Sequence, residues 1–138
     1  MADHRELFKG SLRRCLDAPD FLVRFYELFL NSSPEVRAKF EKTDFEKQRR
    51  ALRDSFFVLE MIGESTPDAP TWKALKKLAV THDRQHMDVQ PELYDLWLEC
   101  LLKSVAEHDP QYSAEVGLAW RIQLKDGIEY MRAAWRAS

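Results

Sequence analysis

Hydrophobic residues recur at helical spacing along most of the chain. The first predicted helix ends near Asp17, because Pro19 follows it and proline interrupts helices. Its hydrophobic positions fall at i, i+4, i+7 and i+8 and are Phe8, Leu12, Cys15 and Leu16. A second helix, predicted to begin near Asp20, is apolar over so wide an arc that it must pack on two sides.

Two further helices carry start signals in the sequence. Ser33 followed by Pro34 is typical of an N-cap and a first helical position, which predicts a short helix over residues 36–40 at a corner of the chain. The segment TDFE at residues 43–46 matches a capping box whose first residue is the N-cap, and it predicts a long helix that ends near Gly63. One face of that helix carries Leu52, Phe56 and Leu59, and the amide of Gln48 lies in the same apolar stripe.

The C-terminal half alternates loops and helices. Residues 64–70 have the composition of a loop, and the helix after them is predicted to end near His86. The inward face of this helix carries Leu75, Leu78, Ala79, His82 and His86. A link over residues 88–91 precedes a strongly periodic helix that includes Leu93, and Asp109-Pro110 breaks the chain before a long final helix. The pattern predicts an all-α fold of about seven helices, either a bundle or a globin-type sandwich.

Composition narrows the class of protein. The 138 residues can bury one sizeable core, and only 4 glycines disfavour a turn-rich all-β architecture. The net charge is -2 and no basic tract accompanies aromatic residues on a strand, so neither nucleic acid nor an anionic membrane is indicated as a partner. Cys15 and Cys100 form no CxxC arrangement and fit buried, reduced thiols. Without a secretory signal or a run long enough to cross a bilayer, we expect a single domain over residues 1–138 in the cytoplasm.

His82 is the candidate for chemistry, because it ends an otherwise apolar helical face. A histidine among apolar residues is often a satisfied core residue, so this pattern alone leaves a structural role open. His82 and His86 also form an HxxxH spacing like that of di-iron bundles. Such a site needs more imidazoles than the 4 histidines present, of which His4 and His108 lie far from this helix in the sequence.

Three segments of the chain resemble bacterial single-domain haemoglobins and the haem domain of flavohaemoglobins. FYELFLNSSPEVRAKF, at residues 25–40, is similar to their B and C helices, with an FY pair, a proline and a phenylalanine at the corner. KKLAVTH, at residues 76–82, resembles the F helix that ends in the proximal histidine, and PELYDLWLECLL, at residues 91–102, resembles the start of the G helix. The resemblance covers almost the whole chain. It implies a globin fold, which is a three-on-three sandwich of about seven helices with the D helix short or absent.

The resemblance also implies a b-type haem cofactor, with His82 as the axial ligand to the iron. Tyr26 and Gln48 would lie on the distal side, where a diatomic gas binds, and Leu52 would press on the ligand site. Phe40 would stack on the porphyrin. The remaining cofactor contacts that we expect are Leu78, His86, Val89 and Tyr94.

Physical chemistry supports these roles independently. An axial imidazole is neutral and donates through its other nitrogen to a carbonyl or carboxylate, and the carbonyl of Leu78 lies one turn before His82. Bound oxygen carries partial negative charge, so a donor favours it over nearly neutral carbon monoxide by about 1.5–3 kcal/mol for each hydrogen bond. Tyr26 and Gln48 can supply two such donors. Each residue also fits an ordinary role, Tyr26 and Phe40 in a core and Gln48 in solvent.

His86 is the less favoured ligand. It lies four residues after His82, so both imidazoles cannot be placed equally well on one iron. His82 completes the KKLAVTH block, whereas His86 would reach a haem propionate or face solvent.

Two departures from the family bear on activity. The link between His82 and Tyr94 is slightly longer than in bacterial haemoglobins, so the turn after the proximal helix is expected to be reshaped. In flavohaemoglobins a glutamate late in the final helix joins the proximal histidine and a tyrosine, whereas here the segment reads MRAAWRAS, with Trp135 near that place. The missing carboxylate disfavours peroxidase-like chemistry and efficient dioxygenation of nitric oxide.

The predicted function is therefore reversible binding of oxygen, nitric oxide or carbon monoxide at a five-coordinate haem iron. One alternative is a nitric oxide dioxygenase that works with a separate reductase as its external electron donor. Another is a gas-sensing or haem-free globin-fold signalling module. Assembly into a homodimer is left open.

Overall fold

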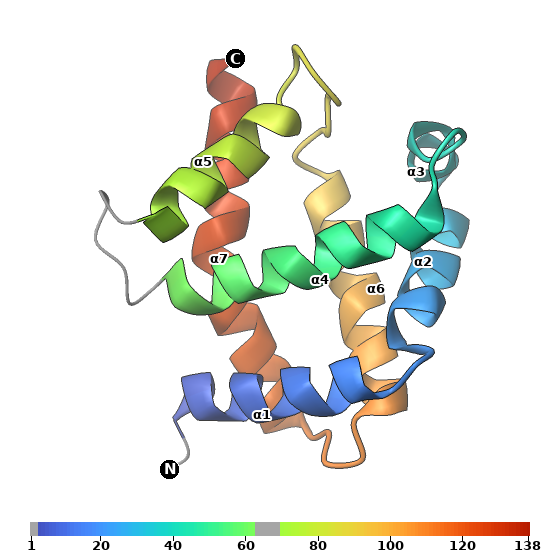
Figure 1. Ribbon diagram of the computed structural model, residues 1–138, viewed down its shortest axis with the longest axis vertical. Helices are drawn as coiled ribbons and strands as arrows, with labels where there is room; N and C mark the ends of the chain where they lie inside the picture. The colour runs from blue at the N-terminus through green and yellow to red at the C-terminus, as the bar shows by residue number, and fades with distance from the viewer. Residues whose placement is uncertain (1–2, 63–69) are drawn as a thin grey trace.

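Seven helices form the regular structure of residues 3–62 and 70–138, which are the residues that the computed structural model describes (Figure 1). Within these residues there is no strand, so the predicted all-α fold is confirmed. The predicted cap at Gly63 and the predicted loop over residues 64–69 lie outside them. In chain order the helices are α1 (His4–Asp17), α2 (Phe21–Ser32), α3 (Pro34–Lys39), α4 (Phe45–Met61), α5 (Pro70–Thr81), α6 (Leu93–His108) and α7 (Ala114–Ala137).

The helices pack in two crossed layers. In Figure 1, α1, α4 and α5 cross over α6 and α7, and α2 packs beside α6. This is the three-on-three sandwich that the resemblance implies. Residues 40–44, between α3 and α4, contain no helix, as expected for a fold without a D helix.

Side chains cap the N-termini of α3 and α4. Ser33 Oγ accepts a hydrogen bond from the N–H two residues later at 3.1 Å, and Pro34 takes the first helical position of α3, as predicted. The N-cap of α4 is Asp44 and not Thr43, the first residue of the expected capping box. Asp44 Oδ1 accepts from the N–H of Lys47 at 3.3 Å. Aspartate caps a helix at least as well as threonine, so local propensity does not separate these two neighbours.

The end of α5 also differs from the sequence prediction. The helix ends at Thr81, before His82, so the expected extension to His86 is wrong. Residues 82–87 fold into turns, and the N–H of Met87 donates to the carbonyl of Thr81 at 3.1 Å. His86 therefore does not continue the helical face that leads to His82.

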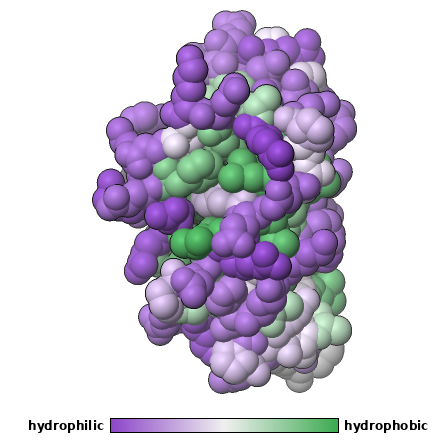
Figure 2. Space-filling view, turned by 90° about the vertical axis from the view of Figure 1, so that its right-hand side faces the viewer, coloured by the Kyte–Doolittle hydropathy of each residue, from purple (hydrophilic) through white to green (hydrophobic). Residues whose placement is uncertain are grey.

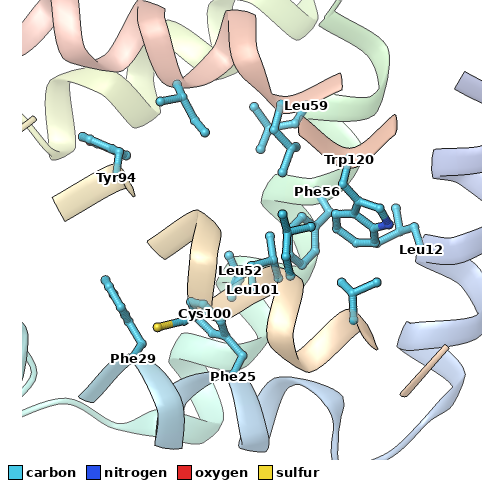
Figure 3. Close-up of a cluster of buried hydrophobic side chains, with 14 of the residues drawn as sticks. Leu12, Phe25, Phe29, Leu52, Phe56, Leu59, Tyr94, Cys100, Leu101 and Trp120 are labelled. Carbon is cyan, nitrogen blue, oxygen red and sulfur yellow. The ribbon is translucent and has the colours of Figure 1, made fainter. Parts of the chain in front are cut away.

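Large side chains from both layers form the core (Figure 3). Trp120 of α7 is fully buried against Phe8 of α1 and Phe56 of α4, with ring centroids 4.8 and 6.1 Å away. Phe25 of α2 stacks on Phe29 at 5.4 Å. The Trp120 contacts join the first, fourth and last helices, and Phe25 and Phe29 of the second helix belong to the same core cluster.

Cys15 of α1 and Cys100 of α6 are both buried and free, as the sequence predicted. Burial raises the pKa of the Cys15 thiol to about 12 and also raises the pKa of Cys100. Both side chains therefore act as small core residues at neutral pH.

A buried polar network joins the first helix to the last two. The carboxylate of Asp109, which follows α6, accepts from Ser11 Oγ at 2.6 Å and from the guanidinium of Arg14. Ser11 Oγ in turn accepts from Trp120 Nε1 at 2.9 Å. Burial by itself raises the pKa of Asp109, but the hydrogen bonds from Arg14 and Ser11 outweigh it and hold that pKa below its usual range. The carboxylate is therefore charged and fully partnered.

α4 and α7 approach closely at Gly127. A Cβ at this position would lie 2.3 Å from Cδ2 of Leu59, so only glycine fits the contact as it stands. Nearby, Gln123 Nε2 donates to the carbonyls of Leu59 and Glu60 at 3.2 and 3.0 Å. These bonds satisfy carbonyls that the end of a helix leaves unpaired, and they fix α4 against α7.

Candidate functional site

A cavity of about 270 Å³ lies between the two layers, bounded by parts of α2 to α7 and by the turn after α5. Most of its lining is apolar, which is typical of sites for small molecules and cofactors. Lys39 and the exposed Met87 lie at its mouth, where Lys39 Nζ donates to the Met87 carbonyl at 3.2 Å. On the face turned to the viewer, Figure 2 shows apolar side chains in a hollow that hydrophilic surface surrounds.

His82 enters the cavity from the end of α5. Its N–H donates to the carbonyls of Leu78 and Ala79, both at 3.2 Å, so the residue still closes the last turn of the helix. Its ring Nδ1 lies 2.8 Å from the carbonyl oxygen of Leu78. The expected bond between this ring and the carbonyl one turn back is therefore present.

The imidazole of His82 is neutral and presents one nitrogen as a ligand. Burial lowers the pKa of His82, and the bond to Leu78 offsets this only in part. A carbonyl can only accept, so Nδ1 must carry the hydrogen. The lone pair is then on Nε2, which is the form of imidazole that binds metals.

Tyr26 of α2 and Gln48 of α4 meet on another wall of the cavity. Gln48 Nε2 donates to the Tyr26 hydroxyl oxygen at 3.2 Å. Burial raises the pKa of Tyr26 to about 12, so its hydroxyl remains protonated at neutral pH. Because this oxygen already accepts from Gln48, the hydroxyl hydrogen is available to an acceptor inside the cavity.

Phe40 and Leu52 complete this wall. The Phe40 ring is half-buried and lies edge-on to Tyr26, with centroids 5.7 Å apart. Leu52 is buried on α4, one turn after Gln48. The structure brings eight of the predicted site residues into the lining of this one cavity: Tyr26, Phe40, Gln48, Leu52, Leu78, His82, Val89 and Tyr94.

His86 is the predicted residue that the structure does not place in this lining. Its Nδ1 lies 2.8 Å from Oδ1 of Asp83, and 54% of its side chain is exposed. Of the two roles left open for it, this position fits a solvent-facing histidine and not a contact to a cofactor.

Tyr94, at the start of α6, brings a buried hydroxyl that has no hydrogen-bond partner among the described residues. Burial raises the pKa of Tyr94, so this hydroxyl is neutral. An unpaired buried polar group costs about 1–3 kcal/mol, so a polar partner inside the cavity would be favoured. Among the described residues no carboxylate bonds to this hydroxyl, and Trp135 near the end of α7 donates from Nε1 to Asp88 Oδ1 at 2.8 Å.

Sequence reasoning missed part of the lining. Ala51 and Ser55 follow Gln48 at helical spacing, so the face of α4 that carries Gln48 was sufficient to find them. Lys39 carries the one formal charge among the described residues that line the cavity. Nothing in the sequence distinguishes it from the exposed basic residues around it. Further lining residues come from α6 and α7 and are Trp97, Ile128 and Met131.

This arrangement fits a largely apolar cofactor that carries a metal ion and acidic groups at its edge. Nε2 of His82 offers one metal ligand, and the apolar lining suits the body of such a molecule. Lys39 places a cation at the mouth, and Tyr26 directs a donor into the interior. The unpaired hydroxyl of Tyr94 leaves a further polar contact open.

Residues 23–128 match the family model of the globins, and this is more than half of the chain, so the protein belongs to the globin family. It is similar to a protein of Pseudomonas aeruginosa PAO1 whose crystal structure is described as structurally highly homologous to a human haemoglobin. The two share 38% sequence identity at a TM-score of 0.90, over 96% of this chain and 98% of the other. No curated protein matches with comparable significance. Among the described helices, none is both long and apolar enough to cross a membrane.

Proposed function

We propose that the protein binds haem b in this cavity and binds oxygen or a related diatomic gas reversibly. The observation that carries the proposal is the geometry of His82. Its Nδ1 is committed to the Leu78 carbonyl at 2.8 Å, so Nε2 is free as a metal ligand in an apolar cavity. When haem is in place, it supplies the iron to which the gas binds.

In this proposal each wall of the cavity has its own task. His82 holds the iron through Nε2, in an orientation that Leu78 fixes. Tyr26 donates its hydroxyl hydrogen to the gas, and Gln48 keeps the phenol in place. Phe40 stacks on the porphyrin.

We assign to Lys39 the contact with a haem propionate, for which His86 was one candidate in the sequence. The carboxylates of haem are charged and leave an apolar cavity at its mouth. Lys39 Nζ lies there, donates to the carbonyl of Met87, and has no carboxylate partner among the described residues. It is therefore available to pair with an anionic group that projects from the cavity.

The surroundings of Tyr94 favour binding over turnover. Its hydroxyl lacks a carboxylate partner within the described residues, so the proximal network that the resemblance implies is incomplete. Nitric oxide dioxygenation would also require an external reductase. We therefore infer a gas-binding globin. We also propose that it is organised as one domain over residues 1–138 and is located in the cytoplasm.

Absorption spectra test the proposal. The purified protein, loaded with haemin and then reduced, is expected to give the spectrum of a five-coordinate, imidazole-ligated ferrous haem, and its Soret band should shift when carbon monoxide is added. Protein that takes up no haem in defined stoichiometry would overturn the proposal.

Two matched variants test the axial ligand. His82→Ala is expected to abolish stable haem binding, whereas His86→Ala is expected to leave the spectrum unchanged because His86 lies outside the lining. An imidazole-ligated ferrous spectrum that persists in His82→Ala and disappears in His86→Ala would mean that His86, and not His82, is the axial ligand.

A further inference from the structure

The turn that follows α5 is hydrogen-bonded to His82 itself. The N–H of Val89 donates to the carbonyl of His82 at 3.0 Å, and the N–H of Met87 donates to that of Thr81 at 3.1 Å. The backbone of His82 is thus fixed by α5 on one side and by residues 83–89 on the other. Any change in the shape of this turn is transmitted to the imidazole.

Asp88 is the strained point of the turn. Its φ of 51° lies in the left-handed region, which residues other than glycine seldom adopt. Its N–H donates to the carbonyl of Asp83 at 2.8 Å, and its side chain accepts from Trp135 Nε1 at 2.8 Å. Such a conformation persists only where the surroundings determine it, and the bond from Trp135 comes from another helix.

Arg84 holds Trp135 against the same turn. Its guanidinium carbon lies 4.0 Å from the centroid of the indole ring, and its Nε donates to the Trp135 carbonyl at 3.2 Å. The N–H of Arg84 also donates to Ser138 Oγ at 3.1 Å. We call Arg84, Asp88 and Trp135 the C-terminal clamp. Figure 1 shows the last turns of α7 beside α5, and the clamp joins α7 to the turn that follows α5.

We propose that Trp135 is a positioning residue for His82. Its hydrogen bond to Asp88 fixes the turn over residues 83–89, and the turn fixes how far and at what angle the His82 imidazole reaches toward the metal. The inference rests on the proposed function, because it requires His82 as the axial ligand. Trp135 acts through the backbone that carries His82. The structure records no contact between Trp135 and the His82 ring.

Trp135→Phe tests this, because it keeps an aromatic ring for Arg84 and removes the indole N–H together with the second ring of the indole. In the deoxygenated ferrous protein, the iron–histidine stretching band in the resonance Raman spectrum is expected to shift by several wavenumbers and to broaden. The rate of carbon monoxide recombination after photolysis is expected to change about two- to tenfold. Arg136→Gln, at the next and exposed position of α7, is the matched control and should change neither readout.

Asp88 provides a second route to the same result. Asp88→Asn keeps an acceptor oxygen and tolerates the left-handed region, so its band is expected near the native frequency. Asp88→Ala loses the acceptor and also disfavours the left-handed region, so it should shift the band at least as far as Trp135→Phe does. The double variant should show the same band as Asp88→Ala alone, because the hydrogen bond is already absent from that variant. If Trp135→Phe fails to fold, the comparison of Asp88→Ala with Asp88→Asn carries the test.

The outcomes separate the two proposals. Absence of any iron–histidine band from the haem-loaded native protein would overturn the proposed function. A native band that stays at the same frequency in both Trp135→Phe and Asp88→Ala would overturn the clamp alone. A double variant whose band shifts further than that of Asp88→Ala alone would also overturn it, because Trp135 would then act on His82 by a route other than Asp88.

Discussion

The hydroxyl of Tyr26 is the residue-scale feature that should separate one gas from another. It is buried, it accepts from Gln48, and its hydrogen is available to an acceptor in the cavity that Tyr26 lines. Tyr26→Phe is expected to speed oxygen release about ten- to a hundredfold, because a hydrogen bond to a charged acceptor contributes about 1.5–3 kcal/mol. Carbon monoxide release should change little. Stopped-flow measurement of both rates checks this. Equal effects on the two gases would mean that Tyr26 donates no hydrogen bond to bound oxygen.

Lys39 is expected to govern retention of the cofactor. Lys39→Gln removes the one cation among the lining residues that the structure describes, and it should speed haem loss to a scavenger globin by roughly two- to fivefold, as for a partly exposed ion pair. Haem dimethyl ester, which lacks free carboxylates, should be lost equally fast from the native protein and the variant. If the two proteins also differ with the ester, Lys39 acts through the shape of the mouth and not through charge.

The residues of the site divide by how visible they are in the sequence. His82, Tyr26 and Gln48 were predicted because each is a polar group within a helical apolar pattern or a family-like block. Lys39 was missed because its contribution depends on where the corner after α3 meets the turn after α5, which is a tertiary contact. His86 was misplaced for a related reason, since helical spacing predicted its position and the helix ends before it.

At the scale of elements, periodicity and proline predicted where the helices lie, but not where α4 begins or where α5 ends. The N-cap of α4 is displaced by one residue from the expected box, because Thr43 and Asp44 are both suitable caps. The end of α5 is set by the hydrogen bonds of the following turn and by Trp135, which comes from the far end of the chain. Local helix propensity includes neither the hydrogen bonds of that turn nor the bond from Trp135.

The contact between α4 and α7 gives a prediction about stability. Gly127→Ala places a methyl group 2.3 Å from Leu59 Cδ2, and Leu59 is buried, so the free energy of unfolding should fall by about 1–3 kcal/mol. Gly10→Ala in α1 is the matched control. There the new methyl group meets Nη1 of Arg14 at 3.1 Å, on a guanidinium that Asp109 holds, so this contact should offset part of the gain of about 0.5–1 kcal/mol from the better helix propensity of alanine. Urea unfolding of both variants checks this, and a stable Gly127→Ala protein would mean that the helices can move apart at little cost.

At the scale of the whole molecule, Asp109 joins the two ends of the chain. It lies after α6 and binds Ser11 and Arg14 of α1, while Ser11 binds Trp120 of α7. Asp109→Ala leaves Ser11 and Arg14 without this partner, and it should lower the free energy of unfolding at neutral pH by about 3 kcal/mol.

The same variant should show a defined pH dependence. The pKa of Asp109 is lowered in the folded protein, so its contribution is present above the unfolded pKa of about 3.9 and is lost as the pH falls through the folded value. The difference between native protein and Asp109→Ala should therefore shrink as the pH falls below about 4. Unfolding curves at a series of pH values measure it, and a difference that does not depend on pH would mean that the charge of Asp109 does not contribute.

The two buried thiols have a chemical consequence for the proposed binding of reactive gases. With the pKa of Cys15 near 12 and that of Cys100 also raised by burial, almost no thiolate exists at neutral pH, and the thiolate is the form that alkylating and nitrosating agents attack. While the fold stays closed, the chain offers such agents no sulfur nucleophile from either position. Modification at Cys15 or Cys100 would then report molecules whose fold had opened.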